Sequence, residues 1–485
     1  MIEFIIKLHP EIVIKSNSVR KRQTKLLERN LKTILVQVEP SVRVNNNFDH
    51  LIVRCDSDSA ALRQKLIDRL SCIPGIVNFS EMQSSQFSTL DDIYQQVKAV
   101  YASQLENKTF CVRARRMGTH DFSSIDAERY IGGGLNQLVA SAKVQLKKPD
   151  VVVNIEIKRD ILIMVRQSHA GMGGFPLPSQ SDVLSLISGG YDSAVASYLM
   201  IRKGLRTHYV FFNLGGAAHE AGVREMSHLI WHKYSLSHKV KFVSVNFAPV
   251  VDEILEKIDN GLMGVVLKRM MMRAASTVAE KLGIKAIVTG ESIGQVSSQT
   301  IANLNAIDRV TDMLILRPLI YHDKQQIIDL AKQIGAEDIA KSMPEYCGVI
   351  SRKPTINAVL SEVLANEDNF DFSVLDNAVQ QAKVLDIRTI DYQADQQAHV
   401  VSELSELAAN GIVLDIRPPE ETDLKPLQLP EVEVIELPFF RLSSQFANLD
   451  QSKQYYFYCE KGVMSRLQAV VMQDQGFSNV AVYRP

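Results

Sequence analysis

Val183-Leu184-Ser185-Leu186-Ile187-Ser188-Gly189-Gly190-Tyr191-Asp192-Ser193 is the stretch that decides the fold of this chain. Its first five residues predict a buried strand, and residues 194–203, closed by Gly204, predict a helix directly after the loop. Glycines let the loop turn sharply and bring backbone N–H groups close to an anion, and the helix N-terminus adds free donors and partial positive charge. No Gly-Lys-Ser/Thr follows, so this is not the Walker loop. The sequence therefore predicts a phosphate loop; the ordinary alternative is a glycine turn capped by Ser193 or Asp192.

Strands and helices alternate on the C-terminal side of this loop. The pattern predicts strands at 208–213, 240–246 and 286–289, helices at 218–236 and over most of 249–282, and more helix from Lys324 onward. Such alternation is typical of βαβ units around a parallel sheet. We therefore expect a doubly wound α/β domain here.

On the N-terminal side, residues 1–170 indicate an α+β arrangement in two small units. Strands are expected at 2–8, 50–54, 75–79 and 110–116, helices at 18–35, 59–70, 89–105 and 124–142, and a hairpin at 151–157 and 161–167. The Gly/Pro-rich segment 171–178 separates these units from the phosphate loop.

The C-terminal residues predict one more compact α/β unit. After a polar, linker-like stretch near 390–402, strands are expected at 412–416, 432–436, 454–458 and 480–483, with a helix at 465–475. A chain of 485 residues is too long for one hydrophobic core, so several domains are expected.

Composition and charge narrow the class of protein. No apolar run reaches the roughly 18 residues of a membrane helix, and the N-terminus lacks the pattern of a signal peptide, so no membrane is expected and a cytoplasmic location follows by default. Residues 1–180 carry 25 lysines and arginines against 18 acids, whereas residues 381–485 carry 9 against 15. A basic first third favours nucleic-acid binding, although a solvated charged face would give the same count.

The five cysteines, Cys55, Cys72, Cys111, Cys347 and Cys459, form no CxxC pair, which argues against a zinc site or a disulfide scaffold. Cys459 directly follows a predicted strand and begins the loop Cys459-Glu460-Lys461-Gly462-Val463-Met464-Ser465 before a predicted helix. Free N–H groups at such a place favour a thiolate or a persulfide anion. A buried, inert cysteine is the alternative, and the same alternative applies to Cys347 in its turn after Pro344.

The phosphate loop resembles the SGGxDS motif of the PP-loop ATP pyrophosphatases, which hold the departing pyrophosphate while a substrate oxygen takes AMP. The resemblance implies that the loop binds ATP through Ser188, Gly189, Gly190, Tyr191, Asp192 and Ser193. It further implies that Leu186 and Ile187 offer backbone hydrogen bonds to adenine. Asp192 is expected to be catalytic, either by binding the Mg²⁺ carried by ATP or by positioning the reacting groups. Lys268, Gly290 and Gln299 are the other residues expected at the ATP site; Lys268 could equally be a solvated surface lysine.

Two further resemblances cover the ends of the chain. The Cys459 loop and Leu414-Asp415-Ile416-Arg417 resemble rhodanese domains. Residues 110–134 resemble the THUMP domain of RNA-modifying enzymes, and residues 1–60 resemble the ferredoxin-like domain that often precedes it. The basic residues expected to contact RNA are Arg113, Arg115, Arg116, Lys147 and Lys148.

In this order the parts resemble the long form of the tRNA 4-thiouridine synthetase family. The expected domains are ferredoxin-like (1–60), THUMP (61–170), PP-loop (178–388), a linker (389–403) and rhodanese (404–485). The resemblance implies that a cysteine desulfurase loads sulfur on Cys459 and that ATP adenylates O4 of uridine 8 of tRNA. The sulfur then attacks C4 either directly from the persulfide or after Cys347 releases it, and a disulfide of Cys347 with Cys459 results. The resemblance also implies sulfur transfer to a carrier protein for the thiamine thiazole.

Two other functions fit parts of the sequence. A PP-loop ligase acting on another substrate would leave the rhodanese-like tail without a role. An RNA-binding sulfur carrier without catalysis would leave the intact phosphate loop without one.

Overall fold

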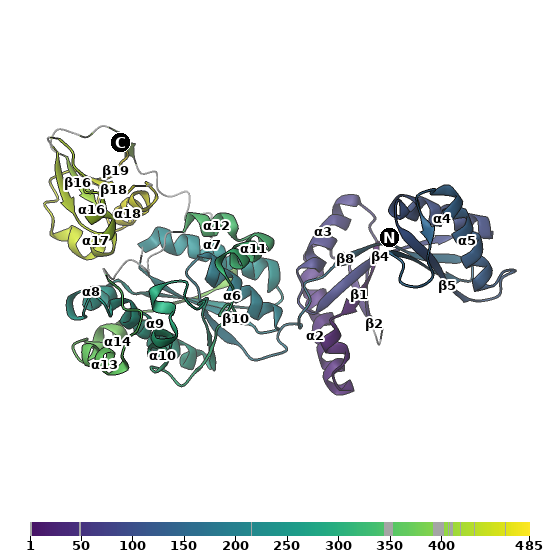
Figure 1. Ribbon diagram of the computed structural model, residues 1–485, viewed down its shortest axis with the longest axis horizontal. Coiled ribbons are helices and arrows are strands. Elements are labelled where there is room, and N and C mark those ends of the chain that lie inside the picture. Colours follow the sequence, from purple (N-terminus) through teal and green to yellow (C-terminus); the bar gives the residue numbers. More distant parts are fainter. Residues whose placement is uncertain are drawn as a thin grey trace. The chain divides into compact units, whose positions relative to one another are not determined.

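The computed structural model describes residues 2–47, 50–214, 216–343, 353–390, 402–405, 407, 411–417, 419–430, 432–460 and 462–485. The chain divides into two compact units. The first comprises Met1–Ser179 with Arg202–Gly204, and the second comprises Gln180–Ile201 with Leu205–Pro485 (Figure 1).

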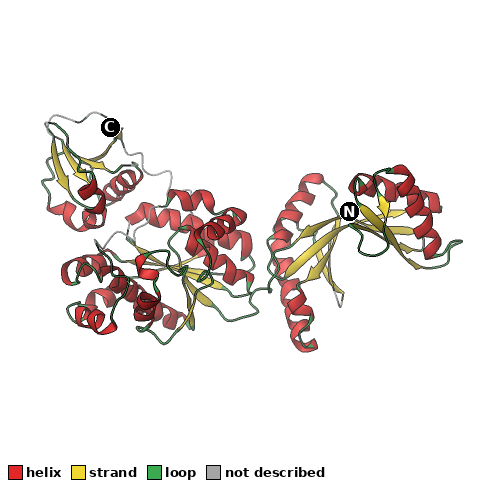
Figure 2. Ribbon diagram, viewed as in Figure 1, coloured by secondary structure: helices red, strands yellow, loops and turns green. Residues whose placement is uncertain are grey.

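The first unit is built on one eight-stranded sheet with helices packed on it (Figure 2). The strand order is β2-β3-β1-β4-β8-β7-β5-β6. The strands are β1 (Ile2–Leu8), β2 (Arg43–Asn47), β3 (His50–Cys55), β4 (Ile76–Gln86), β5 (Thr109–Met117), β6 (Lys143–Val144), β7 (Val151–Lys158) and β8 (Ile161–Ala170). The helices are α1 (Pro10–Val13), α2 (Asn17–Leu35), α3 (Ala60–Ser71), α4 (Leu90–Tyr101), η1 (Ala102–Leu105) and α5 (Ser124–Leu138).

Strands β4 and β8 join what the sequence presents as two units. They pair antiparallel from Asn78↔Ala170 to Gln86↔Ile161. One end of β4 also pairs with β1, and one end of β8 pairs with β7. The expected hairpin of β7 and β8 is confirmed, whereas the strand expected at 75–79 runs on to Gln86. The two groups of strands therefore share one continuous sheet.

Local sequence signals fix where helices α4 and α5 begin and how closely they pack. Each begins at a capping box, Thr89 with Asp92 and Ser123 with Asp126, which satisfies backbone N–H groups of the first turn. A Cβ on Gly134 of α5 would lie 2.4 Å from the Tyr94 ring of α4, so glycine allows the two helices to approach closely. Helix α5 ends at Leu138 rather than the expected residue 142, because the backbone of Val139 is no longer helical.

The second unit contains the predicted doubly wound α/β domain. Its sheet has the order β13-β12-β9-β10-β11-β14, and the pairs are parallel except for β14, which runs antiparallel to β11. The strands are β9 (Val183–Leu186), β10 (Thr207–Asn213), β11 (Lys241–Asn246), β12 (Ala286–Val288), β13 (Leu314–Leu316) and β14 (Lys383–Asp386). Its helices are α6 (Tyr191–Arg202), α7 (Gly216–Tyr234), α8 (Ala248–Lys257), α9 (Met263–Leu282), η2 (Ser297–Gln299), α10 (Ile301–Asp308), α11 (Lys324–Ile334), α12 (Glu337–Ser342), α13 (Leu360–Glu367), α14 (Phe372–Gln380) and η3 (Ile387–Thr389).

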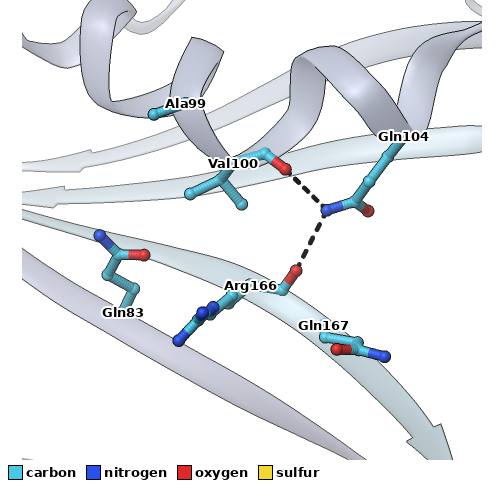
Figure 3. A pocket seen from close by; sticks show the side chains of 6 residues that line it. All are labelled: Gln83, Ala99, Val100, Gln104, Arg166 and Gln167. Carbon is cyan, nitrogen blue, oxygen red and sulfur yellow. Dashed lines mark hydrogen bonds between the residues drawn. The ribbon is translucent and has the colours of Figure 1, made fainter.

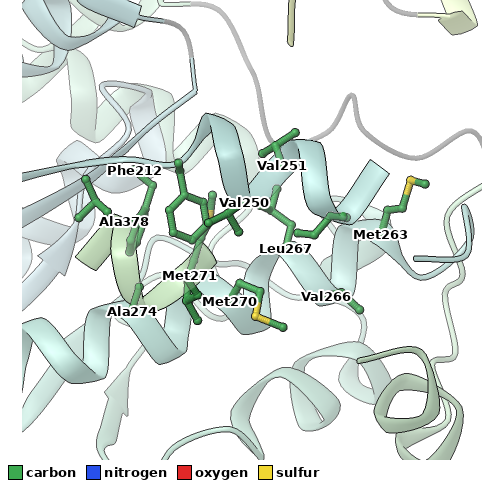
Figure 4. Packing of buried hydrophobic residues seen from close by; sticks show 14 of the residues in the cluster. Phe212, Val250, Val251, Met263, Val266, Leu267, Met270, Met271, Ala274 and Ala378 are labelled. Atoms are coloured by element: carbon green, nitrogen blue, oxygen red, sulfur yellow. The ribbon is translucent and has the colours of Figure 1, made fainter. Parts of the chain in front are cut away.

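Helix α9 lies at the centre of the core of this domain. Its apolar face, including Leu267 and Met270, packs with Phe212 of β10 and Val250 of α8 (Figure 4). Leu267 and Met270 are fully buried. Each Å² of apolar surface removed from water stabilises the fold by about 25 cal/mol, so this face is a main source of the domain's stability. The helix ends at Gly283, whose positive φ of 72° closes it.

The C-terminal part has a five-stranded parallel sheet of its own, in the order β15-β19-β18-β16-β17. Its elements are β15 (Glu403–Leu404), β16 (Ile412–Asp415), α16 (Pro419–Leu424), β17 (Glu433–Glu436), α17 (Phe439–Gln445), η4 (Phe446–Asn448), β18 (Tyr455–Tyr458), α18 (Val463–Asp474) and β19 (Val480–Tyr483). The strands expected here are confirmed, and β15 is an addition.

Candidate functional site

The loop between β9 and α6 is held by its own serines. The backbone N–H of Ser188 donates to Oγ of Ser193 (3.1 Å), and the Ser193 hydroxyl donates to the carbonyl of Gly190 (3.2 Å). Gly189 has a φ of +80°, in the region that favours glycine. The loop therefore turns sharply at the carboxyl end of β9 and leads into the N-terminus of α6, as the sequence predicts.

Asp192 is bound by two residues that sequence reasoning missed. Nζ of Lys324, the first residue of α11, lies 3.0 and 3.1 Å from its two carboxylate oxygens, and Nε2 of Gln295 donates at 2.9 Å. The Lys324 ammonium also lies 5.6 Å from the centre of the Tyr191 ring. The structure thus places a cation directly over the acidic end of the phosphate loop.

Gly290 touches the same loop from the neighbouring strand. It follows β12, and a Cβ on it would lie 2.6 Å from the carbonyl carbon of Asp192 and 2.8 Å from the backbone nitrogen of Ser193. Real Cβ atoms do not approach backbone atoms so closely. Gly290 is therefore the residue that lets β12 and the start of α6 meet, and the structure brings it beside Asp192.

Lys268 is paired rather than free. Its Nζ donates to Glu291 (2.9 Å), which also accepts from Nε of Arg317 (2.8 Å) and from the hydroxyl of Thr289 (3.0 Å). Glu291 is 7% exposed. Its burial would raise the pKa of the carboxyl, but the charges and hydrogen bonds of Lys268 and Arg317 outweigh this and lower the pKa to about 2. Glu291 and Arg317 are further site residues that the sequence did not reveal.

Gln299 and Ile187 each make a hydrogen bond that holds the domain together. Gln299 is buried, and its side-chain oxygen accepts from the backbone N–H of Ser292 (3.2 Å), so it braces the loop after β12. The backbone N–H of Ile187 donates to the carbonyl of Val210 (2.9 Å). The sheet therefore uses this N–H, and the expected backbone contacts of Leu186 and Ile187 with adenine stay a prediction. Leu186 lies at the end of β9, as expected.

Cys459 lies between β18 and α18, at the expected strand-to-helix turn. Its half-buried Sγ accepts from the backbone N–H of Ser465 (3.3 Å) and lies 3.4 Å from the Ser465 hydroxyl. Ser465 is fully buried, and Gly462 makes the loop's turn with a φ of +71°. The turn therefore presents a helix N-terminal donor to sulfur, which stabilises an anionic sulfur species.

Cys347 lies outside the residues that the structure describes. Met343, the last described residue before it, has its side chain against the phosphate loop, since a Cβ on Gly189 would lie 2.8 Å from Cε of Met343. Among the described residues there is no group of three or more His, Cys, Asp or Glu that could hold a metal ion.

The predicted RNA-contacting residues divide between the two faces of β5. Arg113 and Arg115 are exposed on one face, whereas Arg116 points to the other and donates to the carbonyl of Gly118 (3.2 Å). Successive residues of a strand point to opposite faces, so Arg116 does not share the surface of Arg113 and Arg115. Lys147 and Lys148 are exposed after β6.

The first unit also contains a polar cavity of about 360 Å³ between α4, η1, β4 and β8 (Figure 3). Gln104 donates there to the carbonyls of Val100 and Arg166. The remaining lining residues are Gln83, Ala99 and Gln167.

Comparison with known proteins finds relatives that match the chain over almost its whole length. It is 58% identical over 482 residues to the tRNA sulfurtransferase of Tolumonas auensis, and the match covers 99% of each chain. This chain belongs to the tRNA sulfurtransferase family. The tRNA sulfurtransferases of Colwellia psychrerythraea (56%, 100% of each chain) and Histophilus somni (57%, 99% of each chain) are similar to it as well. The resemblance predicted from the sequence is thus confirmed.

Family models match three parts of this tRNA sulfurtransferase-family chain. The ThiI ferredoxin-like domain matches residues 3–80, the THUMP domain matches 87–165, and the model described as thiamine biosynthesis protein (ThiI) matches 178–372. A solved structure described as a 4-thiouridine synthetase–RNA complex with bound ATP superposes with a TM-score of 0.67 at 23% identity. It covers 80% of this chain and 99% of its own, which confirms the fold of the part that it covers. None of the described helices could cross a membrane.

Proposed function

We propose that this member of the tRNA sulfurtransferase family uses ATP to replace O4 of uridine 8 in tRNA by sulfur, giving 4-thiouridine. The observation that carries the proposal is the close association of Asp192, Lys324 and Gly290 around the phosphate loop. The match of the whole chain to tRNA sulfurtransferases supports the choice of substrate.

In the first step the phosphate loop would hold ATP and direct its cleavage between the α and β phosphates. The backbone N–H groups of Gly189 and Gly190 would bind the leaving pyrophosphate at the N-terminus of α6. Lys324 and Lys268 would supply the cations that neutralise the growing negative charge. Mg²⁺ would come with ATP, with Asp192 as the carboxylate nearest to it. The step makes AMP the leaving group at C4 of the uracil ring, where a carbonyl oxygen would leave poorly.

In the second step Cys459 would carry sulfur as a persulfide loaded by a cysteine desulfurase. The Ser465 N–H, 3.3 Å from Sγ, is placed to stabilise the anion. The terminal sulfur would attack C4 and expel AMP, leaving a C4–S–S–Cys459 linkage. The Cys347 thiolate would then attack Sγ of Cys459, freeing the thiouridine and forming a Cys347–Cys459 disulfide. A two-electron reductant would restore both thiols.

Binding of tRNA would use the basic first unit. Arg113 and Arg115 are exposed side by side on one face of β5, and Lys147 and Lys148 follow nearby in the sequence. Such residues contact the phosphate backbone and the shape of the RNA rather than its bases.

A second acceptor is supported by a separate observation. The model matching 178–372 is described as a thiamine biosynthesis protein. We therefore propose that the Cys459 persulfide also supplies sulfur to a carrier protein for the thiamine thiazole.

Two substitutions separate the two steps. Cys459→Ala is expected to abolish 4-thiouridine formation while tRNA binding and tRNA-dependent pyrophosphate release continue. Asp192→Ala is expected to stop pyrophosphate release while Cys459 is still loaded by the desulfurase. Cys72→Ala is the matched control, because this half-buried cysteine lies in the first unit. A Cys459→Ala chain that still thiolates tRNA with the desulfurase as donor would refute the sulfur route.

A further inference from the structure

Tyr321 is an exposed aromatic side chain beside the candidate site. It lies between β13 and α11 and is 80% exposed. Among the described residues no other Tyr, Phe or Trp exceeds 46% exposure. An aromatic ring that is exposed to this degree contributes little to the core, and its face is free to stack on a ligand.

The turn that carries Tyr321 is fixed by hydrogen bonds on both sides. The N–H of Ile293 donates to the carbonyl of Ile320 (3.1 Å), and the hydroxyl of Ser292 donates to the carbonyl of His322 (2.6 Å). The His322 ring lies against the Tyr321 ring, with centroids 4.4 Å apart and planes at 30°. The ring is therefore exposed and at the same time held in one position.

Tyr321 has an exposed apolar residue, Ile293, on one side and the phosphate-loop lysine, Lys324, on the other. Ile293, whose backbone is bonded to the residue before Tyr321, is 49% exposed. Lys324, three residues further on, reaches Asp192 at 3.0 Å. Three residues of chain span at most about 11 Å, so the Cα atom of Tyr321 lies within about 11 Å of the Cα atom of Lys324, the residue whose ammonium reaches the phosphate loop.

We propose that Tyr321 is the stacking platform for the uracil whose O4 is activated, an inference that rests on the proposed function. A base buried in the stacked core of tRNA must leave its stack before an enzyme can act on it. Proteins hold such a base on an aromatic ring, since every base has a π face. Stacking covers the face of uracil and leaves its edge, with O4, directed toward ATP on the phosphate loop. The neighbouring Ile293 would pack against another edge of the base, away from O4.

The test compares Tyr321→Ala with Tyr321→Phe in the full-length chain. Phenylalanine keeps the stacking ring, so tRNA-dependent pyrophosphate release should stay within about twofold of the original, whereas alanine should lower it at subsaturating tRNA by about 5- to 150-fold. ATP affinity should be unchanged in both. Leu314→Ala is the matched control, because Leu314 is 62% exposed on the edge strand β13 of the same sheet.

A second readout needs no turnover. Fluorescence of pyrrolocytosine placed at tRNA position 8 should change when the tRNA binds the original chain or Tyr321→Phe, because the base leaves its stack, and the change should differ in Tyr321→Ala, which offers no ring. The same fluorescence change and undiminished pyrophosphate release in Tyr321→Ala would overturn the proposal. So would a loss seen only when the desulfurase is the sulfur donor, since that would make Tyr321 a contact for the donor protein. If the original chain and Tyr321→Phe change the fluorescence of the base in the same way and Tyr321→Ala does not, while no 4-thiouridine forms, the proposed function is refuted and the stacking is supported.

Discussion

Replacing Glu291 by glutamine removes the charge that pairs with both Lys268 and Arg317. The carboxylate is 7% exposed, and the glutamine has nearly the same volume, so the change is electrostatic. It leaves two cations facing one neutral amide, and Lys268 loses the partner that holds its Nζ at 2.9 Å.

The magnitude follows from the pKa of Glu291, which is lowered from 4.5 to about 2. At 1.36 kcal/mol per unit this depression corresponds to roughly 3 kcal/mol of folding free energy. Because the folded-state pKa is the lower one, the contribution is present above pH 4.5 and is lost as the pH falls toward 2. At neutral pH, Glu291→Gln should therefore lower the free energy of unfolding by about 3 kcal/mol, and the variant should lose less than the original chain on acidification.

A second glutamate separates stability from ATP binding. Glu367, the last residue of α13, is 3% exposed. Its carboxylate pairs with Arg269 (2.6 Å) and Arg273 (2.9 Å) of α9. Glu367→Gln should also destabilise the fold, by about 3–5 kcal/mol. In ATP titrations of the folded proteins, Glu291→Gln should bind ATP roughly tenfold or more weakly, because Lys268 is no longer held where its ammonium can contact ATP. Glu367→Gln should bind ATP as tightly as the original chain. Equal ATP affinity of the two variants would refute the reasoning about Lys268.

The remaining predictions concern the two loops. Gly290→Ala should lower the free energy of unfolding by about 1–3 kcal/mol in urea titrations and should weaken ATP binding, because its Cβ would meet the backbone of Asp192 at 2.6 Å; unchanged ATP affinity would contradict this. Ser465→Ala should slow alkylation of Cys459 by iodoacetamide at neutral pH by about two- to tenfold, while Ser465→Thr should preserve it; equal rates in all three proteins would show that the hydroxyl 3.4 Å from Sγ has no effect on the thiolate.

Local sequence patterns were sufficient for the phosphate loop and for the Cys459 turn. In both, an apolar strand, a glycine-containing loop and a helix follow one another within a short stretch, so periodicity and turn chemistry determine the result. The doubly wound sheet followed from the same alternation of elements, and the structure confirms it.

The partners of the site residues could not be found in this way. Lys324 lies 132 residues from Asp192, and Glu291 lies 23 residues from Lys268, so only the tertiary fold brings these charges together. A helix was expected from Lys324 onward, and the structure starts α11 there with a capping box at Asp323, but nothing in the sequence said where that helix points. The sequence also does not reveal which strand pairs with β9, and so it did not show that the N–H of Ile187 is bound to the carbonyl of Val210.

The shared sheet of the first unit was missed for a different reason. The second half of β4, Gln83-Ser84-Ser85-Gln86, has no alternation of apolar and polar residues. Its pairing with β8 depends on backbone hydrogen bonds and on register, which side-chain patterns do not encode. The strand expected at 75–79 therefore ended too early.

The central claim is that this chain exchanges oxygen for sulfur on tRNA at the expense of ATP. The most direct measurement is mass analysis of nucleosides from unmodified tRNA incubated with the full-length chain, Mg²⁺-ATP, a cysteine desulfurase and cysteine. We predict a 4-thiouridine signal that maps to position 8 and disappears when ATP is omitted. A tRNA that stays unmodified with every component present, or that gains sulfur equally well without ATP, would contradict the account.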